Sequence, residues 1–155
     1  MAKTSTNLYR SVMDERYTIT VGDYPGDGVL DPRWRETTYV DRKGQTRTSQ
    51  ADVVVTGSDV EAGGGTSLHD VPRWYSAPDF WIPEGTEYSE AEIHIRKDKK
   101  QSSSPYNRSL SGFHYQLEPK YKMPIVSFQG ALNNMARAAV VQQIAASRGQ
   151  VKSKA

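Results

Sequence analysis

The sequence predicts an α+β fold in which short strands fill most of the chain and an amphipathic helix lies near the C-terminus. Segments rich in β-branched and aromatic residues recur between turns that contain glycine and proline, as expected for short strands. A helical period covers residues 128–147, and its apolar stripe consists of Phe128, Leu132, Met135 and Ala139. Because the strands precede the helix instead of alternating with helices, the order is typical of the α+β class.

The individual elements follow from local patterns. We expect strands at residues 8–12, 17–21, 52–56, 92–96 and 113–117, and over residues 80–86 a strand that ends in a Pro-x-Gly turn. Residues 22–32 have the composition of turns, and residues 42–44 predict a hairpin. Residues 66–70 predict a short helix, because a hydroxyl after a glycine run is a favourable N-cap. Residues 97–105 predict a polar loop, because they offer nothing to bury.

The terminal helix has recognisable ends. Ser127 is a candidate N-cap, and Gly149 lies just beyond the last periodic residue. We therefore expect one domain over residues 1–149 and a disordered basic tail over residues 150–155. A chain of 155 residues is long enough to bury a single core.

Composition excludes several classes of protein. The chain has no cysteine, which excludes disulfides, thiolate nucleophiles and zinc sites of the cysteine type. No apolar run approaches the roughly 20 residues of a membrane-spanning helix, so we expect no membrane association. The first residues lack the apolar core of a secretory signal peptide, so export would need a route without such a signal.

Charge is distributed unevenly along the chain. Residues 1–90 carry 9 basic and 15 acidic side chains, a balance of −6, and residues 91–155 carry 11 basic and 3 acidic side chains, a balance of +8. A basic C-terminal part is able to attract a nucleotide, a nucleic acid or an acidic partner. A solvated basic surface explains the same pattern, so charge alone leaves both interpretations open.

Three short motifs in a fixed order predict a dinucleotide site. Leu8-Tyr9-Arg10 supplies an arginine that is able to hold a pyrophosphate by paired hydrogen bonds. Residues 63–67 join a glycine turn, where backbone approaches a ligand closely, to the hydroxyls of Thr66 and Ser67. Residues 112–115 place a histidine and a tyrosine on a strand, where they are able to orient a ribose. A site for a dinucleotide such as NAD needs these groups.

These motifs resemble the Type-Six-Exported-Two family, bacterial toxins of the type VI secretion system whose fold is similar to mono-ADP-ribosyltransferases. The similar segments are residues 8–10, 64–67, 82–86, Asp98 with Tyr106-Asn107, His114-Tyr115, Met123, and the helix positions Gly130, Leu132, Asn134 and Arg137. Order and approximate spacing match over about residues 8–145. The resemblance is weakest between residues 14 and 61, and residues 99–105 look like an insertion.

The resemblance implies a split β-sandwich that binds NAD as a substrate in a cleft, without a metal. It implies an enzyme that transfers ADP-ribose to a cytoplasmic target, or hydrolyses NAD, and releases nicotinamide. It further implies an antibacterial type of toxin, made in the cytoplasm of the producer and delivered without a signal peptide into the cytoplasm of a recipient cell. A cognate immunity protein and a secretion carrier or chaperone are the implied partners.

The resemblance also implies roles for individual residues. Arg10, Thr66, Ser67 and His114 are the expected catalytic residues in one cleft, with Arg10 on the pyrophosphate or a ribose and the two hydroxyls on the nicotinamide ribose. Tyr9, Gly65, Asn107 and Tyr115 are the further expected NAD contacts, together with Arg10.

Each of these residues also has a structural interpretation. Tyr9 and Tyr115 fit a core, because side chains alternate along a strand. Asn107 fits a turn, and the hydroxyls of Thr66 and Ser67 fit a helix N-cap. We assign His69 to the surface.

One feature of transferases has no clear equivalent. Most ADP-ribosyltransferases use a glutamate that holds the ribose hydroxyl and stabilises the cation that develops on the ribose. Glu118 follows His114 by four residues but lies near a strand end, and Glu84 and Glu87 lie in a turn region. The motifs therefore leave the acidic residue of the site unassigned.

Two alternatives come from other features. The basic C-terminal part, with Tyr106, His114, Tyr115 and Tyr121 among lysines and arginines, also suits a nucleic-acid-binding protein or a metal-independent ribonuclease. A metal-dependent nuclease is disfavoured, because the sequence shows neither paired carboxylates nor a cluster of metal ligands. The amphipathic helix and the basic tail suit an interaction module of a secretion assembly.

Overall fold

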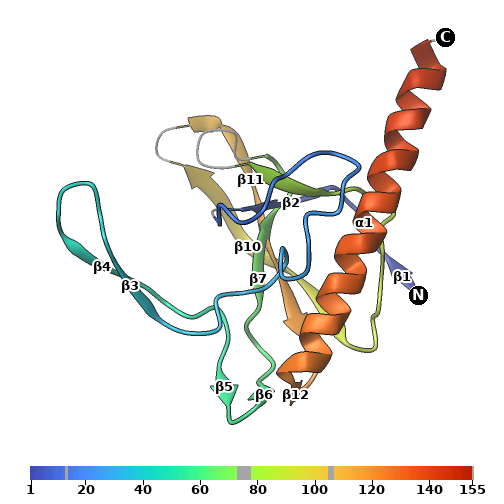
Figure 1. The fold of residues 1–155 in the computed structure, drawn as a ribbon. Helices are drawn as coiled ribbons and strands as arrows, with labels where there is room; N and C mark the ends of the chain where they lie inside the picture. Colours follow the sequence, from blue (N-terminus) through green and yellow to red (C-terminus); the bar gives the residue numbers. More distant parts are fainter. Residues whose placement is uncertain (13, 73–77, 105–106, 155) are drawn as a thin grey trace.

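The computed structural model describes residues 1–12, 14–72, 78–104 and 107–154, and the side chains of these residues except 99–104, 107–111 and 149–154. The described part consists of antiparallel strands in several sheets and one C-terminal helix (Figure 1). This arrangement confirms the α+β class.

The largest sheet has five antiparallel strands. Their order across the sheet is β10 (Ile93–Ser104), β11 (Asn107–Pro119), β7 (Thr66–His69), β2 (Leu8–Ser11) and β8 (Asp79–Ile82). One face carries the apolar side chains, because Leu8 pairs with Ile82 and Leu68 pairs with Tyr115 in the register. These apolar residues form the core, and the opposite face carries polar residues such as His69 and His114.

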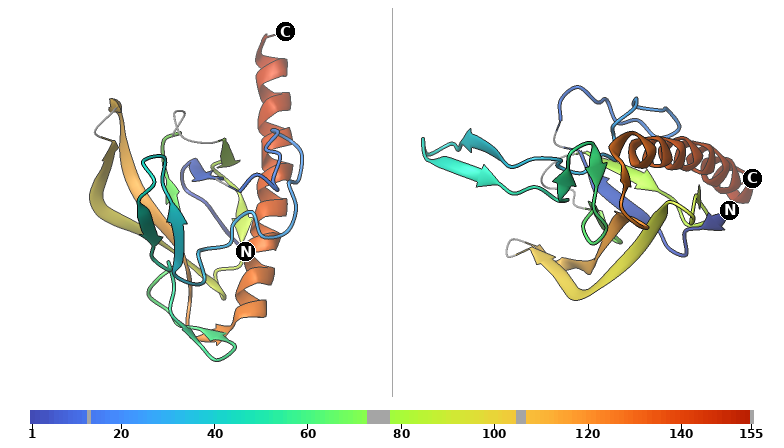
Figure 2. Two further views of the ribbon diagram at one scale, coloured as in Figure 1. Left: turned by 60° about the vertical axis from the view of Figure 1, so that its left-hand side comes forward. Right: turned by 90° about the horizontal axis from the view of Figure 1, so that it is seen from below.

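The other strands form three small sheets. They are β12 (Met123–Pro124) with β6 (Asp59–Val60) and β5 (Val55–Thr56), β1 (Ala2–Lys3) with β9 (Glu87–Tyr88), and β3 (Thr37–Val40) with β4 (Thr46–Ser49). The predicted hairpin is confirmed by β3 and β4, which extend away from the rest of the molecule (Figures 1 and 2). Gly44 in its turn has φ +77°, a conformation that glycine adopts without strain.

The helix α1 (Ile125–Lys154) covers the core beside the five-stranded sheet (Figure 2). Its predicted stripe is confirmed, because Phe128, Leu132, Met135 and Ala139 are all at most 1% exposed. The N-cap prediction for Ser127 is wrong: the helix begins two residues earlier, where the backbone N–H of Ile125 donates to the carbonyl of Ser58 at 2.9 Å.

The helix also runs further than expected. It continues to Lys154, through the segment for which we expected disorder. A single glycine costs only about 1 kcal/mol inside a helix, and the residues after Gly149 include no proline that would end it. The division of the chain at residue 149 stays a prediction.

Two predicted strands are wrong in whole or in part. Residues 17–21 form no strand; Tyr17 and Ile19 instead pack against the core from an irregular segment. Of residues 52–56 only Val55 and Thr56 are in a strand. Val53 is buried in the core and Val55 packs against it, but Val54 between them is 66% exposed, so the apolar run is only partly buried.

Two other segments pair with the sheet against expectation. Residues 66–69 form β7 rather than a helix, because hydrogen bonding to both β2 and β11 overrides the local N-cap pattern. Residues 97–104 belong to β10 rather than to a loop, because β11 pairs with it as far as Ser104. Residue 105, the last of the predicted loop, lies outside the described residues.

Candidate active site

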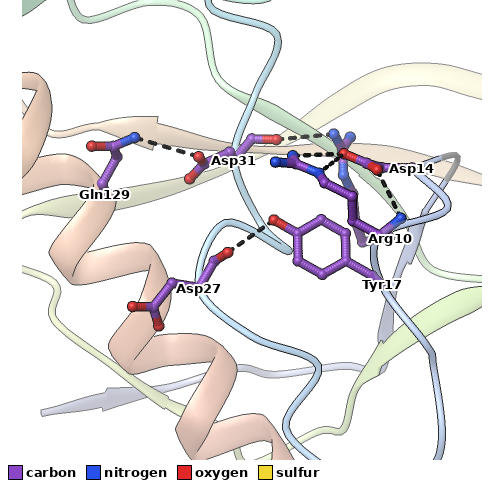
Figure 3. Close-up of polar contacts among 7 residues, drawn as sticks. Arg10, Asp14, Tyr17, Asp27, Asp31 and Gln129 are labelled. Carbon is purple, nitrogen blue, oxygen red and sulfur yellow. Dashed lines mark hydrogen bonds and ion pairs between the residues drawn. The ribbon is translucent and has the colours of Figure 1, made fainter.

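The candidate site begins where β2 and β7 separate. These two strands pair at one position, Tyr9 with His69. Next to this pair, the guanidinium of Arg10 donates from Nη1 to the carbonyl of Ser67 at 3.0 Å. It also donates from Nη2 to the carbonyl of Asp31 at 3.0 Å (Figure 3). Arg10 therefore connects two strands of the sheet with the irregular segment of residues 14–34, which we call the cleft loop.

The cleft loop is held by hydrogen bonds from the sheet. Thr66 Oγ1 donates to the carbonyl of Leu30 at 2.6 Å, and Arg10 donates to the carbonyl of the next residue, Asp31. Two consecutive carbonyls of the loop thus receive hydrogen bonds from two strands. Because the Thr66 and Leu30 side chains are fully buried, this connection lies inside the core.

The helix holds the same loop from another side. Asn133 Oδ1 accepts a hydrogen bond from the backbone N–H of Gly28 at 2.9 Å, and Gln143 Oε1 accepts one from Gly22 at 2.7 Å. Gln129 Nε2 donates to Asp31 Oδ2 at 3.4 Å (Figure 3). The irregular loop therefore has defined contacts on two elements.

Two hollows meet at Arg10. The larger, about 330 Å³, is lined by β2 and the cleft loop, including Tyr17, Asp31 and Trp34. The smaller, about 210 Å³, is lined by Ser67 and His69 together with Arg10, Ser11 and Arg33. Arg10, Ser11 and Arg33 line both hollows, so the two are adjacent parts of one cleft.

The cleft is rich in arginine. Burial lowers the pKa of Arg10, and the charge of Asp52 opposes this effect; the guanidinium remains charged at neutral pH. Arg16 lines the larger hollow and pairs with Asp14 at 2.7 Å, and Arg33 pairs with Asp52 at 3.2 Å. Such a group of planar cations is suited to phosphate oxygens.

A serine and a histidine meet on the polar face of the sheet. Ser67 Oγ lies 2.5 Å from His114 Nε2, and His114 Nδ1 lies 3.5 Å from Asp98 Oδ2. Cross-strand pairing places Ser67 beside Gln116 and His69 beside His114, so all four side chains share this face. The hydroxyl and the imidazole are thus positioned to exchange a proton.

The chain matches a known family over most of its length. The family model described as Tse2 ADP-ribosyltransferase toxin matches residues 3–144. The chain belongs to this family. No curated protein matches the chain. The family match confirms the expected resemblance and identifies the protein as a member of a toxin family of ADP-ribosyltransferases, for which NAD is the implied substrate.

The predicted catalytic residues of this family member do not all meet. The structure brings Arg10, Ser67 and His114 together by hydrogen bonds. Thr66 faces the opposite side of β7, where its buried hydroxyl donates to Leu30. Thr66 therefore lies behind the cleft and holds the cleft loop, instead of forming a pair of exposed hydroxyls with Ser67.

The other predicted NAD contacts are dispersed. Tyr9 is half-buried next to His69, and burial, followed by the charge of Asp79, raises the pKa of its phenol. Gly65 is buried so closely against β11 that an added Cβ would lie 1.9 Å from the carbonyl oxygen of Leu117, which indicates a packing role. Tyr115 packs against the core and lines a different hollow, with Lys97 and Leu8.

Asn107 lies on β11 at the opposite end from Pro119, and the described residues that line the two hollows do not include it. It begins β11 opposite Ser104, and its side chain lies outside the described part of the structure, as does all of Tyr106. The acidic residue Glu118 is 5% exposed and pairs with Arg96 at 2.5 Å, so its carboxylate is already satisfied by the sheet. His69, which we assigned to the surface, is half-buried with its ring centroid 5.4 Å from that of His114.

Sequence reasoning missed the residues of the cleft loop. Asp31, Arg33 and Trp34 line the larger hollow, but their sequence carries only the signal of a turn before Pro32. In the described part of the chain, no three His, Asp or Glu side chains gather as ligands of one metal ion. No helix there is long and apolar enough to cross a membrane.

Proposed function

We propose that this protein cleaves the bond between nicotinamide and ribose in NAD and transfers the ADP-ribose to a macromolecule in the cytoplasm of a recipient cell. One observation carries this proposal: Arg10 stands at the wall shared by two hollows, with its guanidinium fixed by two hydrogen bonds. A dinucleotide has its pyrophosphate between two nucleosides, so an arginine between two hollows matches its shape and charge.

In this reaction the protein mainly positions the substrate and stabilises charge. The bond between ribose C1′ and the nicotinamide nitrogen breaks, both electrons go to that nitrogen, and neutral nicotinamide leaves. The ribose becomes an oxocarbenium-like cation. A nucleophile of the target then adds its lone pair to C1′ and gives up its proton. The site must hold the dinucleotide and stabilise the cation.

The named residues supply these functions. Arg10 uses two of its N–H groups on the protein and keeps the others for the pyrophosphate. In the smaller hollow, Ser67 orients the nicotinamide ribose, and His114 holds the Ser67 hydroxyl by a hydrogen bond from the neighbouring strand. Thr66 acts indirectly, because it holds the loop that forms the other wall.

The partners belong to the same proposal. A toxin that consumes NAD endangers the cell that makes it, so a cognate immunity protein and a carrier or chaperone of the secretion machine complete the system. Hydrolysis to free ADP-ribose differs from transfer only in the acceptor, which is then water.

Release of nicotinamide from NAD by the purified protein, with and without cell lysate, tests the proposal. We expect Ser67→Ala to lower kcat by about 10²–10³-fold, the usual size for a lost catalytic contact. Thr66→Val should leave kcat of the folded protein nearly unchanged while lowering stability by about 1–3 kcal/mol, because a buried carbonyl loses its donor. Ser127→Ala, an exposed hydroxyl on the helix, is the matched control.

The possible outcomes distinguish ADP-ribose transfer, NAD hydrolysis and an activity on RNA. Release that depends on lysate and on Ser67 means transfer to a cellular target, and equal release without lysate means NAD hydrolysis. No release in either condition contradicts the proposal and makes RNA binding and cleavage the next activity to measure. That alternative finds less support in the structure, because the Tyr115 ring packs against the core instead of facing a ligand.

A further inference from the structure

Asp31 has an unsatisfied carboxylate oxygen beside the larger hollow. The residue lines that hollow, and its Oδ1 is buried without any hydrogen-bond partner. Its Oδ2 accepts one long hydrogen bond, from Gln129 at 3.4 Å (Figure 3). A buried carboxylate with an unpaired oxygen costs free energy, so such groups are uncommon unless a ligand completes them.

The position of Asp31 is fixed by the fold. Its own carbonyl accepts from Arg10, and the preceding carbonyl of Leu30 accepts from Thr66. The backbone is therefore held on the sheet while the side chain is held from the helix by Gln129. Oδ1 accepts no hydrogen bond, although the Trp34 side chain stabilises the carboxylate from beside it. Because Asp31 lines the hollow, its carboxylate is available to a donor of a molecule bound there.

Other acids near the cleft lack this property. Asp14 pairs with Arg16 at 2.7 Å, and Asp52 pairs with Arg33 at 3.2 Å. Burial raises the pKa of Asp31, with partial compensation from Gln129, Trp34, Arg10 and Arg16. Perturbed carboxylates in clefts are typical of functional sites.

The larger hollow also has the walls of a nucleoside site. Tyr17 and Trp34 line it, and both rings are held in place: the Tyr17 hydroxyl donates to the carbonyl of Asp27 at 2.8 Å, and Trp34 stands edge-on to Phe128 at 6.3 Å. Aromatic faces with a nearby carboxylate fit a purine base and the hydroxyls of its ribose.

We propose that the larger hollow binds the adenosine half of NAD, and that Asp31 accepts a hydrogen bond from the 2′-hydroxyl of the adenosine ribose. This inference rests on the proposed function. It assigns the two halves of the substrate to the two hollows, with Arg10 between them. It also makes Asp31 a specificity residue, because NADP carries a phosphate in place of that 2′-hydroxyl hydrogen. The phosphate brings no donor at neutral pH and repels the carboxylate.

The test compares NAD with NADP in two measurements. The first is kcat and KM for nicotinamide release. The second is calorimetric binding of each dinucleotide to the Ser67→Ala protein, which measures affinity without turnover. We expect the protein to prefer NAD by at least about tenfold, a factor of the size that one well-placed polar contact supplies. Asp31→Asn should reduce this preference severalfold by raising KM for NAD, with kcat changed less than about threefold.

Asp27→Asn is the matched control, because Asp27 lies in the same loop but is exposed and pairs with Arg137 at 2.8 Å. It should keep the preference for NAD. Equal binding of NAD and NADP by the protein without the Asp31 change would overturn the inference even if Asp31→Asn failed to fold. A loss confined to kcat would also overturn it, because that result places the carboxylate at the reacting ribose. If the protein binds NAD more tightly than NADP but releases no nicotinamide, the proposed function is contradicted and this inference is not.

Discussion

The two walls of the cleft are built in different ways. The sheet wall comes from β2, β7 and β11, where pairing alone sets the positions of Ser67 and His114. The loop wall comes from residues 14–34, which have no strand or helix and are held by separate side-chain hydrogen bonds. A wall made of paired strands is held by many equivalent backbone hydrogen bonds. The loop wall instead depends on a few side chains, each of which fixes one position of the loop.

This difference concentrates importance in the residues that connect the walls. Arg10 and Thr66 lie on the sheet, yet each donates to a carbonyl of the cleft loop. A change at either position should therefore move the loop wall while the sheet stays paired. The predictions below test whether the walls respond separately, as this account requires.

Arg10→Ala should have the largest effect. It removes the contact between the walls, leaves the carbonyls of Ser67 and Asp31 without their donors, and removes the cation proposed for the pyrophosphate. We expect kcat/KM for NAD to fall by at least about 10²-fold and stability to fall by about 2–4 kcal/mol, since each lost donor costs roughly 1–3 kcal/mol. Thermal unfolding and nicotinamide release measure both.

Arg10→Lys sharpens this result, because lysine keeps the charge but not the planar fork that reaches two carbonyls at once. It should recover part of the stability and little of the activity. Arg35→Ala, at an exposed position, is the control. Unchanged NAD cleavage in Arg10→Ala would contradict the assignment of the pyrophosphate to the junction of the hollows.

Gly65→Ala should have the next largest effect, and it acts on the sheet wall. A Cβ at this position would lie 1.9 Å from the carbonyl oxygen of Leu117, so β7 and β11 would have to separate. We expect a loss of stability of about 3 kcal/mol or slightly more, the upper part of the range for overpacking. Gly130→Ala on the exposed side of α1, where nothing lies within 4 Å, should instead stabilise the helix by about 1 kcal/mol. Equal melting temperatures for the two variants would show that the strands tolerate the insertion.

The sheet wall was largely predictable from the sequence. Alternation and β-branched residues predicted the strands that carry Arg10 and His114, and the apolar stripe predicted the helix down to its buried residues. Family motifs then predicted Ser67 on the same site. The main error in this wall was the helix expected at residues 66–70, where a local cap signal was weaker than pairing with two neighbouring strands.

The loop wall was not predictable in the same way. Asp31 lies in a segment with turn composition, and its partners Arg10 and Gln129 are 21 and 98 residues away in the sequence. Hydrogen bonds of this kind leave no period or spacing in the chain. The strand expected at residues 17–21 failed for the same reason, because contacts with the helix and the core, not backbone pairing, fix that segment.

Asp31→Asn should have the smallest effect on stability, and its pH dependence tests the loop wall directly. Burial raises the folded-state pKa of Asp31, against the opposing charges of Arg10 and Arg16, so the folded protein binds this proton more tightly than the unfolded chain does. The favourable contribution is therefore complete below the unfolded pKa of about 3.9 and is lost as pH rises through the raised folded pKa. At pH 7 the asparagine variant should therefore be more stable than the unmodified protein, because an amide carries no charge that burial penalises.

The difference in melting temperature between these two proteins should shrink as pH falls toward 4, because Asp31 is then neutral in both states. Asp27→Asn provides the reference, since Asp27 is exposed and should show no such gain at neutral pH. A gain in stability together with a loss of preference for NAD over NADP would mean that the cleft loop holds a destabilised carboxylate for the substrate. A constant difference at all pH values would mean that the carboxylate is not destabilised by burial, and the loop wall would then be an ordinary packed surface.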